Sequence, residues 1–416
     1  MSEHRNGIVH DFGLNILASA LLTGVIQLIV YPGLSRMIQP DEYGLLLTTM
    51  AVVNVIGSSL GGSLNNTRIL LQGDYDREGV IGDYNMIFAT LAMATVPLTA
   101  AALAITGLTS GVNLFGSVIV AVLVLWRAYY SASFRIRIDY RKNLISSAVS
   151  VTGYALGMLL ARTTGYWSLA FIAGELFACI YIALTGHIVR ESMRRTGLLV
   201  HTLRKYAFLF TGTVLGALNL YLDRFLVYPI LGASEVSTYV VASFLGKSVG
   251  LLMGPVAGVL LTYYAKASVL SRTQFLRQLG LVAAASGVGY ALILLVGQPV
   301  TVLLYPGIAE AAMPYLAIAN LASITFVAGN MIHPSVLSFC DSRWQPAIQG
   351  GYLLAYLGFG VAGAYAAGLW GLCWAVLAVN VVRFMAMGVL VLTCVDSGAA
   401  VRTVTGEGPD VGQCAE

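Results

Sequence analysis

Residues Leu279–Val296 read LGLVAAASGVGYALILLV, an apolar run without a charged side chain. A helix of about 20 such residues spans the hydrocarbon core of a bilayer. Lipid offers no hydrogen bonds to the backbone. A single segment that crosses the bilayer must therefore form a helix, in which its backbone N–H and C=O groups bond to one another. Runs of the same kind recur along the chain, bounded by polar or Pro/Gly clusters. The sequence therefore predicts an all-α polytopic membrane protein.

The composition of the whole chain supports this prediction. Of 416 residues, 58% are hydrophobic and 10% are charged, whereas an average soluble protein has about 25% charged residues. So few charges cannot cover a water-exposed surface, which excludes a soluble globular domain. The sparse charge also excludes a disordered chain, and the five cysteines are too few for a disulfide scaffold.

The apolar runs predict about twelve transmembrane helices. They lie at 12–31, 44–64, 85–106, 113–133, 144–161, 167–187, 206–230, 237–264, 276–296, 311–333, 346–366 and 371–394.

The lysines and arginines predict the orientation of the chain. Most of the 23 lie in the even-numbered loops, whereas Arg36 and Arg162 are the two in odd-numbered loops. Because basic residues are retained on the cytoplasmic side, we expect a multi-pass protein of the inner (cytoplasmic) membrane with both termini cytoplasmic.

A faint internal repeat divides the chain. Tyr31-Pro32 closes the first span and Tyr228-Pro229 the seventh, each shortly before a further tyrosine. With six spans in each half, the halves share one orientation and predict two lobes around a central cavity. We expect an N-terminal lobe at 1–195, a C-terminal lobe at 196–395 and a cytoplasmic tail at 396–416.

Six charged residues lie within predicted spans: Arg127, Glu175, Asp223, Arg224, Lys247 and Arg383. Each costs roughly 2.5–3.5 kcal/mol at the bilayer centre, so we expect them to face one another, a hydrated cavity or an interface. Lys247, in the middle of the eighth span, predicts a cation that holds an anionic substrate. A structural ion pair with Asp223 or Glu175 is the alternative.

The other charges also allow two interpretations. Adjacent Asp223 and Arg224 point about 100° apart on a helix and do not pair with each other. Asp223 and Glu175 are candidates for ion coupling or for structural pairing. Arg127 and Arg383 either reach lipid phosphates or bind substrate.

Two further positions complete the predicted site. Arg36 either contacts an outer-leaflet phosphate or pairs with Asp41 or Glu42. Gly254 and Pro255 follow Lys247 in the same span and predict a hinge, because proline and glycine weaken a helix. No catalytic group, metal site or cofactor is expected.

The segment Tyr31–Gly44, YPGLSRMIQPDEYG, resembles the first-loop signature of bacterial polysaccharide flippases, which translocate O-antigen and capsule repeat units. Asp223–Leu226, Leu231–Ala233 and Tyr239 resemble its counterpart in the second half. These proteins belong to the multidrug/oligosaccharidyl-lipid/polysaccharide exporter superfamily. The resemblance implies two six-helix lobes, and it places substrate-binding cations at Arg36 and at the Asp223-Arg224 pair.

What the resemblance implies is a flippase that moves polyprenyl-pyrophosphate-linked oligosaccharides by alternating access, not an enzyme. Its expected partners are this substrate, membrane lipids and other membrane proteins of polysaccharide assembly, but no nucleic acid. A cation-coupled multidrug exporter is the alternative and would depend on Glu175 and Asp223. A membrane-embedded polymerase or ligase is a second alternative, which the short odd-numbered loops disfavour.

Overall fold

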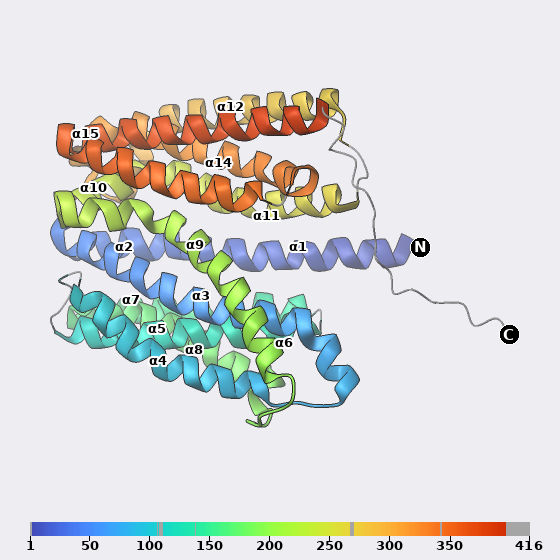
Figure 1. Ribbon diagram of the computed structural model, residues 1–416. Coiled ribbons are helices and arrows are strands. Elements are labelled where there is room, and N and C mark those ends of the chain that lie inside the picture. Colours follow the sequence, from blue (N-terminus) through green and yellow to red (C-terminus); the bar gives the residue numbers. More distant parts are fainter. Residues whose placement is uncertain are drawn as a thin grey trace.

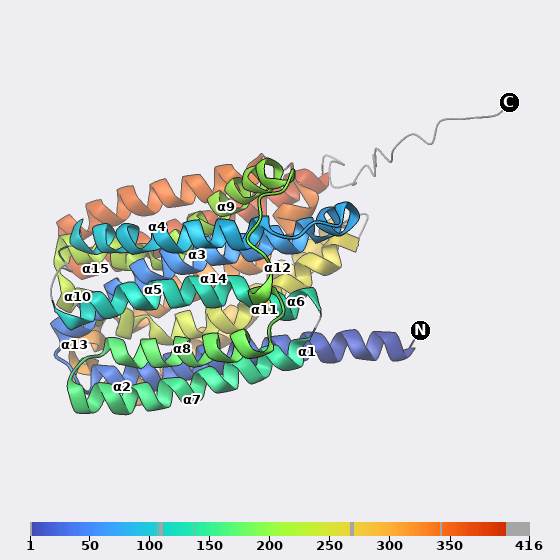
Figure 2. The same ribbon diagram turned by 90° about the horizontal axis from the view of Figure 1, so that it is seen from below.

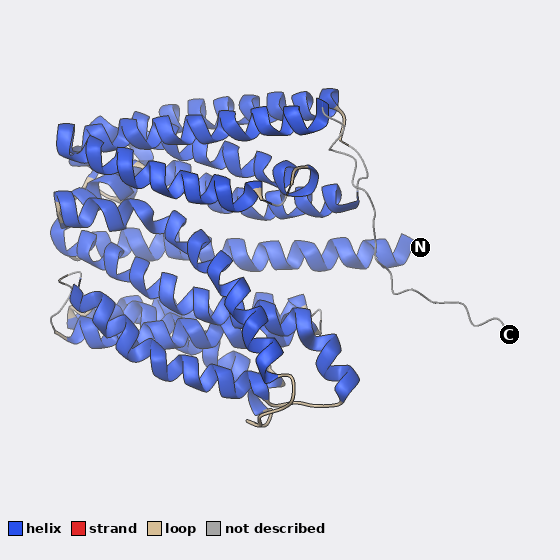
Figure 3. Cartoon of the chain, viewed as in Figure 1, coloured by secondary structure: helices blue, strands red, loops and turns tan. Residues whose placement is uncertain are grey.

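The computed structural model describes residues 2–105, 107, 111–137, 139–266, 270–341 and 343–396, which form a bundle of long helices (Figures 1 and 3). Ten of the described helices are long and apolar enough to cross a membrane. The last of these is two helices in one, because α15 (Trp344–Asp396) leaves helical geometry at Ala367 and Gly368. The predicted all-α polytopic fold is confirmed, and the protein is a multi-pass membrane protein.

The first half of the chain contains α1 (Ser2–Val25), a π-helical turn (Ile26–Val30), α2 (Tyr31–Ser35), α3 (Pro40–Glu78), α4 (Asp83–Ile105), α5 (Val112–Tyr130), α6 (Ala132–Ile136), α7 (Tyr140–Thr164), α8 (Ser168–Thr185) and a short 3₁₀ turn (Ile188–Arg190). The second half contains α9 (Leu199–Leu231), α10 (Ala233–Ala242), α11 (Phe244–Lys266), α12 (Arg272–Leu304), α13 (Ala309–Ala312), a 3₁₀ turn (Met313–Tyr315), α14 (Leu316–Phe339) and α15.

The two halves of the chain form two lobes, and α9 packs against both of them. In Figure 1, α3 to α8 lie on one side and α10 to α15 on the other, while α9 runs obliquely from one group to the other. At its start, Thr202 hydrogen-bonds Tyr75 of α3 at 2.7 Å and Tyr206 packs in the first lobe's core. Further along, Leu226 lies against the second lobe, because a Cβ atom at Gly360 of α15 would be 2.8 Å from Leu226 Cδ1. The predicted boundary after residue 195 stays a prediction.

The lobes meet at one end of the bundle, at a seam where the start of α3 packs on α10. Tyr43 contacts the ring of Tyr305, with centroids 6.3 Å apart. Gly44 lies so close to Ala233 that a Cβ atom at Gly44 would be 1.8 Å from the Ala233 carbonyl oxygen. By the predicted orientation this is the outer end. Figure 1 shows the lobes further apart at the opposite end, where α1 begins. Figure 2 shows the same bundle from below.

Several predicted spans differ from the helices of the structure, most clearly the second and the eighth. The second span was expected to end at residue 64, but α3 continues to Glu78 and stops at Gly79, whose φ of +64° suits a residue without a side chain. Arg68, expected in a loop, lies inside this extension and pairs with Glu191 at 2.7 Å. The eighth span was expected to be one helix, but Ser243 separates α10 from α11.

Candidate functional site

The break between α10 and α11 positions the predicted central lysine. The Asn320 side chain of α14 donates to the Ala242 carbonyl at 2.7 Å and accepts from the Gly246 amide at 2.7 Å. These bonds satisfy backbone groups that a break would leave open in lipid. A Cβ atom at Gly246 would be 2.7 Å from Ser323 Cβ, so glycine lets the helices approach. The next residue, Lys247, is thereby fixed near α14.

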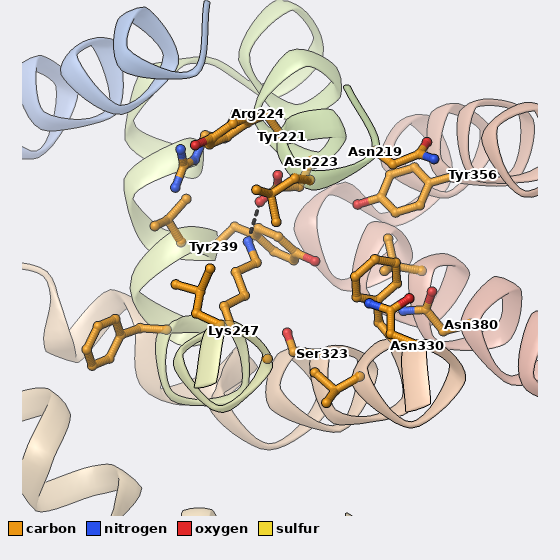
Figure 4. Close-up of a pocket in the computed structure, with 18 of the residues that line it drawn as sticks. Asn219, Tyr221, Asp223, Arg224, Tyr239, Lys247, Ser323, Asn330, Tyr356 and Asn380 are labelled. Atoms are coloured by element: carbon orange, nitrogen blue, oxygen red, sulfur yellow. Dashed lines mark hydrogen bonds and ion pairs between the residues drawn. The ribbon is translucent and has the colours of Figure 1, made fainter. Parts of the chain in front are cut away.

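Lys247 forms an ion pair with Asp223 of α9 (Figure 4). The Asp223 side chain is 6% exposed and that of Lys247 is 30% exposed, because the lysine also faces a cavity. Its ammonium lies 4.9 Å from the centre of the Tyr239 ring. Of the two partners expected for a structural pair, Asp223 is the one observed. The attraction between the two charges offsets part of the cost of burying them.

Arg224 and Arg383 carry positive charge without an ion pair among the described residues. Arg224 is 8% exposed and lies over the Tyr221 ring at 5.1 Å, and its Nε has no hydrogen-bond partner. Arg383 is 6% exposed, and its Nη2 donates to Asn330 Oδ1 at 3.0 Å. Nε and Nη1 of Arg383 are unpartnered. Neither arginine therefore forms an ion pair among the described residues, although Arg224 directly follows Asp223 in the chain.

Asp223, Arg224 and Lys247 line a cavity of about 200 Å³ in the second lobe, and Arg383 adjoins it through its hydrogen bond to the lining residue Asn330. Figure 4 shows the Asp223–Lys247 pair on one side and amide and hydroxyl groups on the other. The lining comes from α9, α10, α11, α14, α15 and, at Gln27, the π-helical turn after α1. Its uncharged polar lining residues are Gln27, Asn219, Tyr221, Tyr239, Ser323, Asn330, Tyr352, Tyr356 and Asn380. Such a cavity combines positive charge, aromatic faces and hydrogen-bonding groups.

Lys247 and Arg224 could be predicted from the sequence, but the uncharged lining of the cavity was not predicted. Asn219, Asn330 and Asn380 all lie within long apolar helices. An amide in such a helix is costly unless it has a partner. That rarity is the signal that would have found them. The tyrosines gave no comparable signal, because the chain has 22.

Arg127 and Glu175 form a second ion pair, in the first lobe. Arg127 Nη2 donates to Glu175 Oε1 at 3.1 Å, and the Tyr154 hydroxyl donates to the same oxygen at 2.9 Å. Arg127 therefore has a partner within the protein, and its contact with lipid phosphate stays a prediction. Neither residue lines the cavity, so the structure does not bring them together with Lys247.

The remaining predicted residues lie elsewhere. Arg36 donates to the carbonyl oxygen of Leu303, at the end of α12, rather than pairing with Asp41 or Glu42. Gly254 and Pro255 lie within α11, but their side chains fall outside the described part of the structure, as does the tail beyond residue 396. Within the described residues, no group of three or more His, Cys, Asp or Glu is arranged to hold a metal ion.

Solved structures with the same arrangement of helices are transporters. A MATE protein in a bent conformation aligns with 95% of this chain and 97% of its own at 12% identity, with a TM-score of 0.61. An inward-facing multidrug resistance MATE family transporter of the MOP superfamily aligns over 93% and 95% at 11% identity and a TM-score of 0.63. For the lipid II flippase MurJ in an inward closed conformation the coverages are 93% and 87%, at 11% identity and a TM-score of 0.66.

No protein-family model matches the chain, and no curated protein matches it by sequence. At such low identity the likeness establishes the fold, not the substrate. The chain has the two-lobe helical fold seen in transporters of the MOP superfamily.

Proposed function

We propose that this protein is a flippase that moves a lipid with an anionic, sugar-bearing headgroup, a polyprenyl-pyrophosphate-linked oligosaccharide, between membrane leaflets. The observation that carries the proposal is two buried arginines at the cavity, Arg224 in its lining and Arg383 bonded to its lining residue Asn330, neither of which forms an ion pair among the described residues. A pyrophosphate would supply the missing negative charge through charge-assisted hydrogen bonds. Amide and tyrosine groups of the lining would contact the sugars.

In this proposal, the headgroup crosses the membrane by alternating access. The seam at Tyr43, Gly44 and Tyr305 closes one end of the bundle, and the lobes separate toward the other. A bilayer opposes the passage of a charged headgroup, and a polar cavity lowers that barrier without covalent chemistry. Rocking of the lobes would then expose the cavity to each side in turn.

The alternative of a cation-coupled multidrug exporter depends on carboxylates. MATE neighbours share the fold, but Asp223 is paired with Lys247 and Glu175 with Arg127. A carboxylate that already has a cation partner is a poorer site for a coupling ion, so the charges favour the flippase.

The test is leaflet exchange in vesicles reconstituted with the full-length protein. The probe is a polyprenyl-pyrophosphate-linked disaccharide with a nitrobenzoxadiazole label on its sugar, which dithionite bleaches from outside. We expect Arg224→Gln and Arg383→Gln to slow exchange at least tenfold, whereas Arg162→Gln, at an exposed arginine in the last turn of α7, leaves it unchanged. Equal exchange in all variants, or rapid export of ethidium but none of the lipid probe, would overturn the proposal.

A further inference from the structure

A second hollow lies on α15, between its two arms. The helix folds back at Gly368, where φ is +59°, and the Cβ position of Gly363 is 2.5 Å from the Gly371 carbonyl oxygen. Further from the turn than this tight contact, the two arms border a groove of about 380 Å³. Its walls are mainly apolar: Ala347, Ile348 and Phe359 on one arm, and Ala375, Val379 and Val382 on the other.

The groove and the cavity share a wall. Tyr352 lines both spaces, and Arg383 lines the groove while its Nη2 bonds Asn330, which lines the cavity. The guanidinium carbon lies 4.9 Å from the centre of the Tyr352 ring and 5.0 Å from that of Phe326. An apolar surface and a polar cavity thus meet at one buried cation.

Any apolar groove in a membrane is covered by lipid chains, so the groove alone indicates no specific ligand. Arg383 makes the difference, because a guanidinium that is 6% exposed keeps two nitrogens without partners. An intramembrane charge without a partner is costly, and a phosphate seated beside it would remove that cost.

We infer that the groove of α15 binds the hydrocarbon chain of the transported lipid while Arg383, at the wall between groove and cavity, holds the phosphate. The inference rests on the proposed function and deepens it by assigning the two ends of the substrate to two adjoining spaces. The chain remains at the lipid-facing surface of the second lobe, and the headgroup crosses inside. Tyr352 and Arg383 form the border between chain and headgroup.

Photocrosslinking tests this assignment. The full-length protein is reconstituted in phosphatidylcholine vesicles with a prenyl phosphate that carries a diazirine at the end of its chain, and labelled peptides are identified by mass spectrometry. The uncharged prenol with the same diazirine is the second probe. We expect the prenyl phosphate to label residues 344–359 and 375–386 at least fivefold more than the prenol does.

Variants separate the chain site from the phosphate site. Ala378→Phe fills the groove from an exposed position and should lower labelling at least fivefold, whereas Ala362→Phe, exposed on the same helix outside the groove, should leave it unchanged. Arg383→Gln should reduce labelling by the prenyl phosphate to the level of the prenol. The Arg383→Lys variant, which keeps the positive charge, should restore part of it.

Three results would overturn the inference: equal labelling by both probes, labelling spread over all lipid-facing helices, or displacement of the probe by equimolar phosphatidylglycerol. Phosphate-dependent labelling of α9 and α11 alone would reject the groove but leave the flippase intact. Strong labelling of the groove without leaflet exchange would instead reject the proposed function.

Discussion

Asp223 and Lys247 show how the cost of a buried charge depends on its partner. Removing one member of a buried ion pair leaves the other charge uncompensated. Removing both members removes the desolvation penalty of the two charges together with their Coulombic attraction. The Asp223 carboxylate is 6% exposed, so water cannot replace the lysine. The partly exposed Lys247 should tolerate the loss of Asp223 better than the reverse.

We therefore predict that Lys247→Ala destabilises the protein by about 3 kcal/mol and that Asp223→Ala costs less. The double variant Asp223→Ala/Lys247→Ala should recover most of the loss. All three variants are measured by thermal unfolding of the purified proteins in detergent. Size-exclusion chromatography after heating gives the fraction of each protein that remains folded. If the double variant is as unstable as the sum of the single ones, the two side chains act independently and the observed pair is not what stabilises this site.

The sequence made the charges of the site predictable but not their partners. Charged residues are rare in the apolar spans, so Arg224, Lys247 and Arg383 could be picked out by position alone. Arg127 and Glu175, by contrast, lie 48 residues apart on α5 and α8, and their pairing depends on how those helices are rotated. Hydropathy fixes where a helix crosses the membrane but gives only weak information about its rotation.

Among the elements, those that end at strong local signals were predicted best. Gly368 lies between the predicted spans 346–366 and 371–394, and the chain turns there. The break at Ser243 carries no such signal, because it is stabilised by Asn320 from a distant helix. The overrun of α3 likewise depends on a tertiary contact, the pairing of Arg68 with Glu191. Interactions distant in sequence therefore account for the wrong boundaries.

The contact between α3 and α10 leads to a prediction about the seam. Gly44→Ala would place a methyl carbon 1.8 Å from the Ala233 carbonyl oxygen, a distance that only separation of the two helices relieves. We expect the seam to open and a cysteine at Val236, which is 1% exposed in the closed structure, to react at least tenfold faster with a maleimide.

Gly62→Ala is the matched control for this experiment. It adds the same methyl group on the same helix, where no atom lies within 4 Å of the new carbon. Its effect on reactivity at Val236→Cys should be negligible. Equal reactivity in the Gly44 and Gly62 variants would mean that the close approach of α3 to α10 does not hold the seam shut.

At the scale of the whole molecule, alternating access requires the seam to open in every cycle. Arg36, just after α2, donates to the carbonyl oxygen of Leu303 in the other lobe, and both residues are exposed. A covalent link at these positions would keep the lobes together at this end. The corresponding link within one lobe, between cysteines at Leu159 and Thr163 on a single turn of α7, would leave the lobes free to rock.

We predict that joining Arg36→Cys to Leu303→Cys with a bis-methanethiosulfonate, in a variant without the five native cysteines, lowers leaflet exchange at least tenfold. Dithiothreitol, which cleaves the link, should restore the exchange rate that the same variant shows before treatment. Because the linked and unlinked states of one variant are compared, a loss of activity caused by replacing Arg36 affects both equally. The Leu159→Cys/Thr163→Cys protein should exchange lipid equally well before and after the reagent. Undiminished exchange by the fully linked protein would show that the substrate crosses without opening of the seam, and alternating access would have to be abandoned.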